Sequence, residues 1–349
     1  MSHAIELGCI TDNPAFRFPR HSEQPRRRYL SLEEVQKAMA DMDASPAQDS
    51  ADAVRLLLAA APEVFTNDIF AMKGGTAINL FVRDMPRLSV DIDVVYTPWQ
   101  VPREQALAAI AGEIDAIAGR LAKRGMRTRK VASKDLGDTK LLIEDADNQV
   151  KIEVNAVFRG TVLPVERRGL TPRTADMFGA ELELPVLATA ELYGSKLVAA
   201  MDRQHPRDLF DAWQMFAAGG LSDATVECFV TYLAGHNRPT HEVLFGNDKD
   251  IADEYRNTFV GMTADPVSLE TLLETRARLR TELPQRLTGA QRHFLTGLSR
   301  AQPDWTLLQC PHAADLPALR WKLANLQTFS KRRPADFEHQ ARALEAKLG

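Results

Sequence analysis

The sequence predicts an α+β protein in which a mixed sheet with flanking helices is followed by a helical domain. Short apolar segments bounded by turn residues recur between residues 69 and 158, which is typical of strands. A long apolar stripe at helical spacing, over residues 103–123, interrupts them. From Leu187 the periodicity is helical almost to the end of the chain. Strands early and helices late indicate two regions that are built differently.

Length and composition are those of an ordinary globular protein. The chain has 349 residues, of which 45% are hydrophobic and 26% charged, enough for one large domain or two modest ones. The net charge of -4 gives no globally basic surface, so any nucleic acid would have to bind a local patch. Three scattered cysteines, and no apolar run of about 18 residues, predict a cytoplasmic protein without a membrane partner.

The N-terminal residues are expected to lie outside the core. Residues 1–29 combine prolines and arginines with little periodicity, which predicts a flexible arm. Two helices are expected next, at 31–42 and 51–61, the first opened by a serine and the second closed by a proline. The core domain is placed at residues 30–165.

A glycine turn follows the first expected strand. The segment 69–72 is short, apolar and closed by Gly74 and Gly75, so we expect a buried strand that enters a tight turn. Residues 76–82 then suit a short helix. The first amide groups of such a helix have no partner within it, which makes the turn a cradle for phosphate.

Two aspartates on one strand form the second half of the predicted site. Side chains alternate along the segment 88–96, so Asp91 and Asp93 share one face while Ile92 and Val94 pack on the other. Neighbouring carboxylates repel each other and lose solvation, and a divalent cation relieves both effects. Carboxylates together with substrate phosphates are ligands that suit Mg²⁺. The alternative is a solvated turn with two surface acids on an edge strand.

The two halves together resemble the nucleotidyltransferase superfamily that includes DNA polymerase beta. The motifs read Lys73-Gly74-Gly75-Thr76 and Arg87-Leu88-Ser89-Val90-Asp91-Ile92-Asp93. These motifs are similar to those of the AbiEii/AbiGii toxins, the nucleotidyltransferases of type IV toxin-antitoxin systems. The resemblance covers about residues 50–260. It implies a polymerase-beta-like core and a toxin that transfers nucleotides to RNA, in related proteins to the 3′ end of tRNA, thereby blocking translation. It also implies a cognate antitoxin encoded nearby.

Three more strands are expected after the long helix, at 126–132, 139–144 and 149–158, the last two joined by a hairpin turn. In the superfamily a third carboxylate usually comes from such a neighbouring strand, where it completes the metal site or serves as general base. The resemblance assigns this role to Glu153. The alternative is a surface strand glutamate paired with Lys151.

A turn-rich segment at 164–179 is expected to separate the core from a helical domain at 180–349. In that domain a helix over 188–201 carries Lys196. An unpaired ammonium group on a helix rich in alanine and leucine would be unfavourable, so Lys196 requires an anion.

The next helix, beginning at Pro206, places Asp208 and Asp211 three residues apart on one face. The resemblance assigns Lys196 to the triphosphate and Asp211 to orienting Lys196 or the acceptor, with Asp208 competing for the second role. The alternative is a structural network between helices that pairs Lys196 with Asp211 and Arg207 with Asp208.

The implied reaction is attack of a hydroxyl on the α-phosphate of a nucleoside triphosphate (NTP), with release of pyrophosphate. The expected catalytic residues are Asp91, Asp93, Glu153, Lys196 and Asp211, of which the first three would hold Mg²⁺, or Mn²⁺ as an alternative. The residues assigned to the nucleotide are Lys73, Gly74, Gly75, Thr76, Ser89, Lys196 and Asp208. Two other functions stay open: a nucleotidyltransferase that modifies a protein or small molecule, and a catalytically silent binding module.

Overall fold

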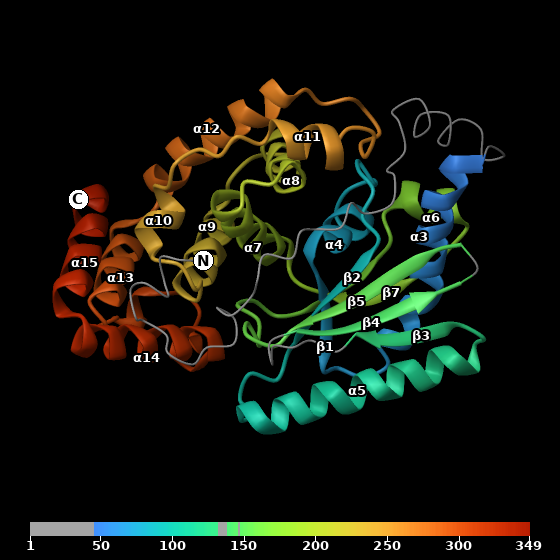
Figure 1. Ribbon diagram of the computed structural model, residues 1–349, viewed down its shortest axis with the longest axis horizontal. Helices are drawn as coiled ribbons and strands as arrows, with labels where there is room; N and C mark the ends of the chain where they lie inside the picture. Colours follow the sequence, from blue (N-terminus) through green and yellow to red (C-terminus); the bar gives the residue numbers. More distant parts are fainter. Residues whose placement is uncertain (1–44, 132–137, 146) are drawn as a thin grey trace. The chain divides into compact units, whose positions relative to one another are not determined.

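The computed structural model describes residues 45–131, 138–145 and 147–349 (Figure 1). The expected arm and the expected helix at 31–42 lie outside the described residues. The described residues form two compact units. The first, which we call the sheet unit, holds those of 45–192 together with 252–268, and the second, the helical unit, holds 193–251 and 269–349.

A seven-stranded mixed sheet is the centre of the sheet unit, with the strand order β3-β4-β5-β2-β1-β7-β6. The strands are β1 (Phe70–Lys73), β2 (Asp91–Tyr96), β3 (Arg127–Val131), β4 (Asp138–Glu144), β5 (Gln149–Asn155), β6 (Glu166–Gly169) and β7 (Glu183–Val186). Strand β2 pairs antiparallel with β1 and parallel with β5, whereas β1 pairs parallel with β7. The predicted α+β class, with a mixed sheet, is confirmed.

The two central strands alternate between buried apolar and partly exposed polar side chains. Ile92 and Val94 of β2, and Ile152 and Val154 of β5, have no exposed surface. Helix α3 (Ser45–Val64) packs on these two strands, and helix α5 (Arg103–Lys123) packs on β3, on β4 and on α3 (Figure 1). Each such side chain contributes roughly 1.5–3 kcal/mol through burial. The polar side chains of β2 and β5 consequently lie on the other face.

Helix α5 has the predicted bounds, because its apolar stripe and its ends are both local signals. Ile110, Ile114, Ile117 and Leu121 are buried. Helix α3 is longer than the expected segment 51–61 at both ends, since it begins at Ser45 and continues beyond Pro62 to Val64. The expected strands at 126–132, 139–144 and 149–158 correspond to β3, β4 and β5.

The segment 164–179, which the sequence predicts to be turns, contains strand β6 and helix α6 (Pro172–Phe178). Strand β6 lies at the edge of the sheet and pairs only with β7, so its charged side chains remain exposed and give no strand-like alternation. Proline at the start of α6 and Gly179, with a left-handed φ of 57°, mark the two ends of that helix.

The division into units differs from the expected boundary at 165–180. It falls between residues 192 and 193, within α7 (Thr189–Asp202), because β6 and β7 complete the sheet. The later segment 252–268, with helix α11 (Ala252–Thr258), also belongs to the sheet unit. Backbone hydrogen bonds attach it there, from Leu88 N–H to Met262 O and from Ala264 N–H to Pro86 O.

The helical unit packs its helices around a core of its own, as the sequence predicts. After α7 its helices are α8 (Pro206–Ala217), α9 (Asp223–Ala234), α10 (Thr240–Leu244), α12 (Leu269–Arg286), α13 (Gly289–Ser299), α14 (Pro317–Arg332) and α15 (Pro334–Leu348). Phe229, Leu279 and Phe294 of this core are fully buried. Throughout the described part of the chain, each helix falls short of the length or hydrophobicity that a membrane span needs.

Candidate active site

The glycine turn is part of the following helix, whereas the sequence predicts that the helix begins after the turn. Strand β1 ends at Lys73 and helix α4 (Gly74–Phe81) begins at the next residue, two positions before the expected start. The two glycines therefore form the first turn of the helix. Gly74 has a φ of 80°, which favours glycine, and a Cβ atom there would collide with the Asp93 carboxylate. The absent side chain lets the start of α4 approach the acid pair.

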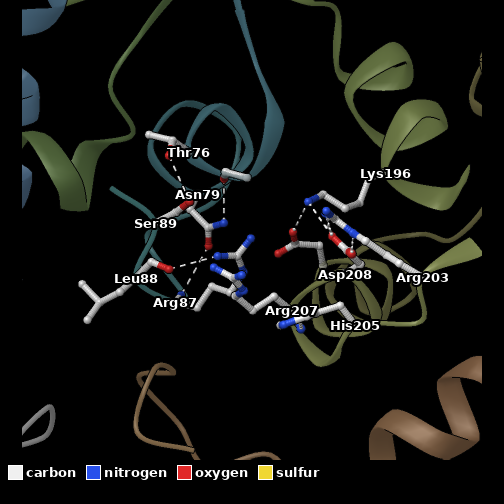
Figure 2. Close-up of polar contacts among 12 residues, drawn as sticks. Thr76, Asn79, Arg87, Leu88, Ser89, Lys196, Arg203, His205, Arg207 and Asp208 are labelled. Carbon is white, nitrogen blue, oxygen red and sulfur yellow. Dashed lines mark hydrogen bonds and ion pairs between the residues drawn. The ribbon is translucent and has the colours of Figure 1, made fainter. Parts of the chain in front are cut away.

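The second glycine allows the segment before β2 to approach the same helix. A Cβ atom on Gly75 would lie 2.5 Å from Nη2 of Arg87 and 3.0 Å from Oγ of Ser89. The Thr76 hydroxyl donates to the Ser89 hydroxyl over 2.9 Å (Figure 2). Thr76 and Ser89, both predicted to contact phosphate, are thus joined at the beginning of α4.

Asn79 fixes the glycine turn from one helical turn away. Its Nδ2 donates to the Gly75 carbonyl over 2.8 Å, and its Oδ1 accepts from the Arg87 backbone N–H over 3.3 Å (Figure 2). Arg87 also donates through Nη1 to the carbonyl of the following residue over 2.9 Å. The sequence analysis assigned no role to Asn79 or Arg87. The sequence gives a weak indication of the contact between Asn79 and Gly75, because Asn79 lies four residues after Gly75 and one helical turn brings the two together.

The acid pair has the expected arrangement along β2. Asp91 and Asp93 are partly exposed, whereas Ile92 between them is fully buried on the opposite face. Asp93 lies opposite Lys73 of β1 in the register of the sheet. Burial, and then the neighbouring Asp91 carboxylate, raise the pKa of Asp93 against the lowering effect of Lys73. A cation between the two carboxylates would favour their ionised forms.

Two carboxylates of this kind fit a divalent metal that takes its remaining ligands from substrate phosphates. Asp91 and Asp93 would be the donors, and a metal would offset the burial and the neighbouring Asp91 charge that raise the pKa of Asp93. Within residues 45–131, 138–145 and 147–349, no group of three or more His, Cys, Asp or Glu side chains is placed to hold a metal ion.

Glu153 lies beside Asp93, but its carboxylate is already paired. It is directly opposite Asp93 in the register of β2 and β5. Its Oε2 is 2.6 Å from Lys151 Nζ, the contact that the alternative interpretation expects, and its Oε1 is 2.8 Å from Lys140 Nζ. Burial acts to raise the pKa of Glu153, but the hydrogen bonds from Lys140 and Lys151 outweigh it and lower that pKa. The role of Glu153 as a third metal ligand stays a prediction.

A second set of predicted residues forms a buried ionic cluster in the helical unit. Lys196 Nζ lies 3.0 Å from Asp208 Oδ1 and 3.1 Å from Asp211 Oδ2 (Figure 2). Arg203 binds Asp208 through both Nε and Nη2, the latter over 2.9 Å. Burial opposes ionisation of Asp208, but Lys196 and Arg203 hold its pKa well below the usual value. Lys196 thus has the anion it requires, and Arg203, for which the sequence predicts no role, is the second cation of the cluster.

Local sequence explains the position of these acids. His205 caps α8 by accepting the Arg207 N–H on its Nδ1 over 3.2 Å, and Pro206 occupies the first helical position. Asp208 and Asp211 then fall within the first two turns, one turn apart, and both side chains are almost fully buried. The helix start therefore directs both carboxylates to Lys196.

Comparisons with known proteins identify the family of the chain. The family described as "Nucleotidyl transferase AbiEii toxin, Type IV TA system" matches residues 55–325. A search of curated proteins finds no match. Among solved structures, MenT4, a nucleotidyltransferase toxin from Mycobacterium tuberculosis H37Rv, is similar with a TM-score of 0.54 and 16% identity, over 90% of this chain and 99% of that chain. That likeness shows a shared fold, and the family match covers most of the chain. The chain belongs to the AbiEii family of nucleotidyltransferase toxins of type IV toxin-antitoxin systems.

Proposed function

We propose that this toxin transfers a nucleotide from an NTP to the 3′ end of tRNA in a Mg²⁺-dependent reaction and thereby blocks translation. Membership of the family makes the chain a nucleotidyltransferase, with an NTP as substrate and an antitoxin as partner. One observation carries the proposal: the Asp93 carboxylate lies against Gly74, at the start of α4. Metal ligands and a phosphate cradle are thereby adjacent.

The sheet unit would bind the phosphates through the first turn of α4. Amide groups of Gly75 and Thr76 point away from the helix, where the helix dipole favours negative charge. The Ser89 hydroxyl, which accepts from Thr76 over 2.9 Å, would donate its own hydrogen to a phosphate oxygen, and Thr76 would orient it. Lys73, which precedes the helix, adds positive charge. These groups would hold the triphosphate in a fixed orientation, which is the main source of rate in phosphoryl transfer.

The acid pair would place the reacting phosphate next to this cradle. A divalent metal bound to Asp91 and Asp93 supplies charge neutralisation at the α-phosphate and activation of the attacking hydroxyl. Because Ile92 is fully buried between them, the backbone that carries the two carboxylates is held in the sheet. Their position relative to Gly74 is therefore set before the nucleotide binds.

Lys196 of the helical unit would contribute a further charge to the triphosphate. Two acids hold its ammonium group, so the orientation of the side chain is determined in advance. Asp208 also receives Arg203 and would keep a cationic partner while Lys196 contacts phosphate. We therefore assign Asp211 to orienting Lys196 or the acceptor, and Asp208 to anchoring the cluster. A structural role and a catalytic role of this cluster are compatible.

A labelling experiment tests the proposal. The protein is incubated with each of the four NTPs, labelled at the α-phosphate, together with Mg²⁺ and total tRNA. Wild-type protein is expected to label tRNA, and Asp93→Asn to reduce labelling by about 100-fold or more, as the loss of a catalytic electrostatic group does. Asp265→Asn, which removes an exposed acid of the same unit, is the matched control and should behave as wild type.

The same experiment separates the other functions. Label that migrates with a polypeptide or a small molecule would assign a different acceptor and overturn the tRNA proposal. No incorporation of label from any NTP, with wild-type NTP binding intact, would indicate a silent binding module. Equal labelling by wild type and Asp93→Asn would contradict the assigned role of the acid pair.

A further inference from the structure

We propose that Glu153 is not a metal ligand but positions Lys151 beside the acid pair, and that Lys151 contacts the triphosphate. This inference rests on the proposed nucleotidyl transfer and changes the assignment of one of its residues. It makes the metal site a two-carboxylate site, formed by Asp91 and Asp93 alone. Glu153, the third carboxylate on this face of the sheet, then serves to hold the ammonium group of Lys151.

The register of the sheet sets the order of charges. Asp91 lies opposite Lys151, and Asp93 opposite Glu153, on the parallel strands β2 and β5. On the next strand, Lys140 lies opposite Glu153. Residues opposite each other across neighbouring strands project to the same face, with side chains in reach of one another. Glu153 is consequently flanked by two lysines and an aspartate on one polar face.

The distances around the Glu153 carboxylate show that it pairs with two lysines. Lys151 Nζ lies 2.6 Å from Glu153 Oε2 and 3.8 Å from Asp91 Oδ2. Lys140 Nζ lies 2.8 Å from Glu153 Oε1. Both carboxylate oxygens of Glu153 thus receive an ammonium group, and the stronger contact of Lys151 is with Glu153. The glutamate holds this lysine at the side of Asp91.

The balance of charges distinguishes two roles for Glu153, that of a metal ligand and that of a partner of the two lysines. To bind a metal together with Asp91 and Asp93, Glu153 would have to release one or both lysines, and their ammonium groups would then face a divalent cation. Repulsion between these charges and lost hydrogen bonds both disfavour that arrangement. With the metal on the two aspartates, Glu153 keeps both partners. Mg²⁺ commonly uses one or two carboxylates and completes its shell with phosphate and water.

The position of Lys151 suits a triphosphate contact. Its side chain is 20% exposed, and its ammonium group is on the face that carries Asp91. A phosphate that shares a metal with Asp91 would come within reach of this group. Lysine carries a compact charge on a flexible stem, so small movements suffice for it to follow the phosphate while Glu153 limits its range.

Direct Mn²⁺ binding, measured by electron paramagnetic resonance without nucleotide, tests the role of Glu153. The informative variant is the double substitution E153Q/K151M, because it removes one negative and one positive charge and leaves the net charge of the site unchanged. We expect its Mn²⁺ dissociation constant to remain within about threefold of wild type. D93N should weaken binding by about tenfold or more, as the loss of a metal ligand does. Weakening of E153Q/K151M to the level of D93N would overturn the inference.

The role of Lys151 is tested by affinity for an α,β-methylene NTP, measured by calorimetry with Mg²⁺. We expect K151M to weaken binding by about tenfold, as the loss of a charge-assisted hydrogen bond does, and K151R to restore most of it. K130M is the matched control, because Lys130 projects to the other face and pairs with Asp115. Wild-type affinity of K151M, or equal losses in K151M and K130M, would overturn the inference.

These readouts separate failure of the inference from failure of the proposed function. Absence of Mn²⁺ and NTP-analogue binding by wild-type protein would overturn both. Mn²⁺ binding by wild type together with loss of Mn²⁺ binding in E153Q/K151M would overturn the inference alone. Circular dichroism verifies folding, and E153A/K151A, which also preserves net charge, repeats the test if the first double variant does not fold.

Discussion

At the scale of single residues, Gly74 has two reasons to be glycine. Its φ of 80° lies in the left-handed region, and a Cβ atom on it would collide with Oδ2 of Asp93. Any side chain would strain the backbone and displace the acid pair. Glycine here therefore serves the geometry of the site as well as the turn.

Gly74→Ala is expected to destabilise the protein by about 1–3 kcal/mol, from left-handed strain and the collision with Asp93. Nucleotidyl transfer should fall more than stability does, because the acid pair moves. Chemical unfolding and labelling rates measure the two effects. Gly112→Ala is the control, since a Cβ atom there meets nothing within 4 Å, and it should be neutral or stabilising by up to about 1 kcal/mol. Equal effects at the two glycines would contradict this account.

Asp93 shows the conflict between stability and function at a single carboxylate. Its folded-state pKa is raised, so the folded state binds a proton more tightly than the unfolded state does. The associated stabilisation is complete below the unfolded pKa, near 3.8, and is lost as pH rises through the folded pKa. At neutral pH the ionised group consequently destabilises the metal-free protein.

Asp93→Asn is expected to raise the Tm of the metal-free protein at neutral pH, and the gain should shrink as the pH falls towards 3.8. Mg²⁺ should raise the Tm of wild type and have little effect on the variant, because a ligand stabilises only the state that binds it. Differential scanning calorimetry, with and without Mg²⁺, measures both. A variant less stable than wild type at neutral pH would show that burial does not govern this group.

At the scale of secondary-structure elements, the cluster formed by Lys196, Arg203, Asp208 and Asp211 joins α7 to α8. Lys196 and both acids are at most 9% exposed, so their pairing is only weakly screened by solvent. The depressed pKa of Asp208 means that its stabilisation is present above the unfolded pKa and is lost as pH falls. The helix pair is expected to depend on this charge at neutral pH.

Asp208→Asn should destabilise the protein by about 3–5 kcal/mol, because it leaves Lys196 with one acid fewer in a buried site. Urea unfolding at neutral pH measures the change. Asp253→Asn removes an acid that is 81% exposed and paired with Arg256, and it should change stability by less than about 1 kcal/mol. A loss at Asp208 as small as that at Asp253 would mean that the cluster does not hold the two helices together.

At the scale of the whole molecule, the sheet unit is discontinuous in sequence. The chain leaves it at residue 192 and returns for 252–268. The returning segment bonds through its backbone to residues 86–88, which precede the acid pair, and Arg87 forms a β-bridge with Thr263. The segment that carries Arg87 and Ser89 is thus held in part by residues from much later in the chain.

Replacement of 252–268 by a flexible linker of the same length should loosen the segment before β2. Hydrogen exchange followed by mass spectrometry is expected to show faster exchange of the Leu88 amide, which donates to Met262 O in the native chain. Amides of α13, in the helical unit, should keep their protection. Unchanged exchange at Leu88 would mean that the returning segment does not support the site.

By itself, the sequence determined the elements whose signals are local. The stripe of α5, the alternation along β2 and the glycines at the start of α4 each depend on neighbours within a few residues, so the fold class and the acid pair could be predicted. Tertiary structure alone decided which charges meet. Lys140 reaches Glu153 through the register of β4 and β5, Asn79 and Arg87 close the turn from separate segments, and β6 joins the sheet at its edge. Such contacts depend on how distant segments pack, because a side chain's partner across a sheet is set by register and not by sequence spacing.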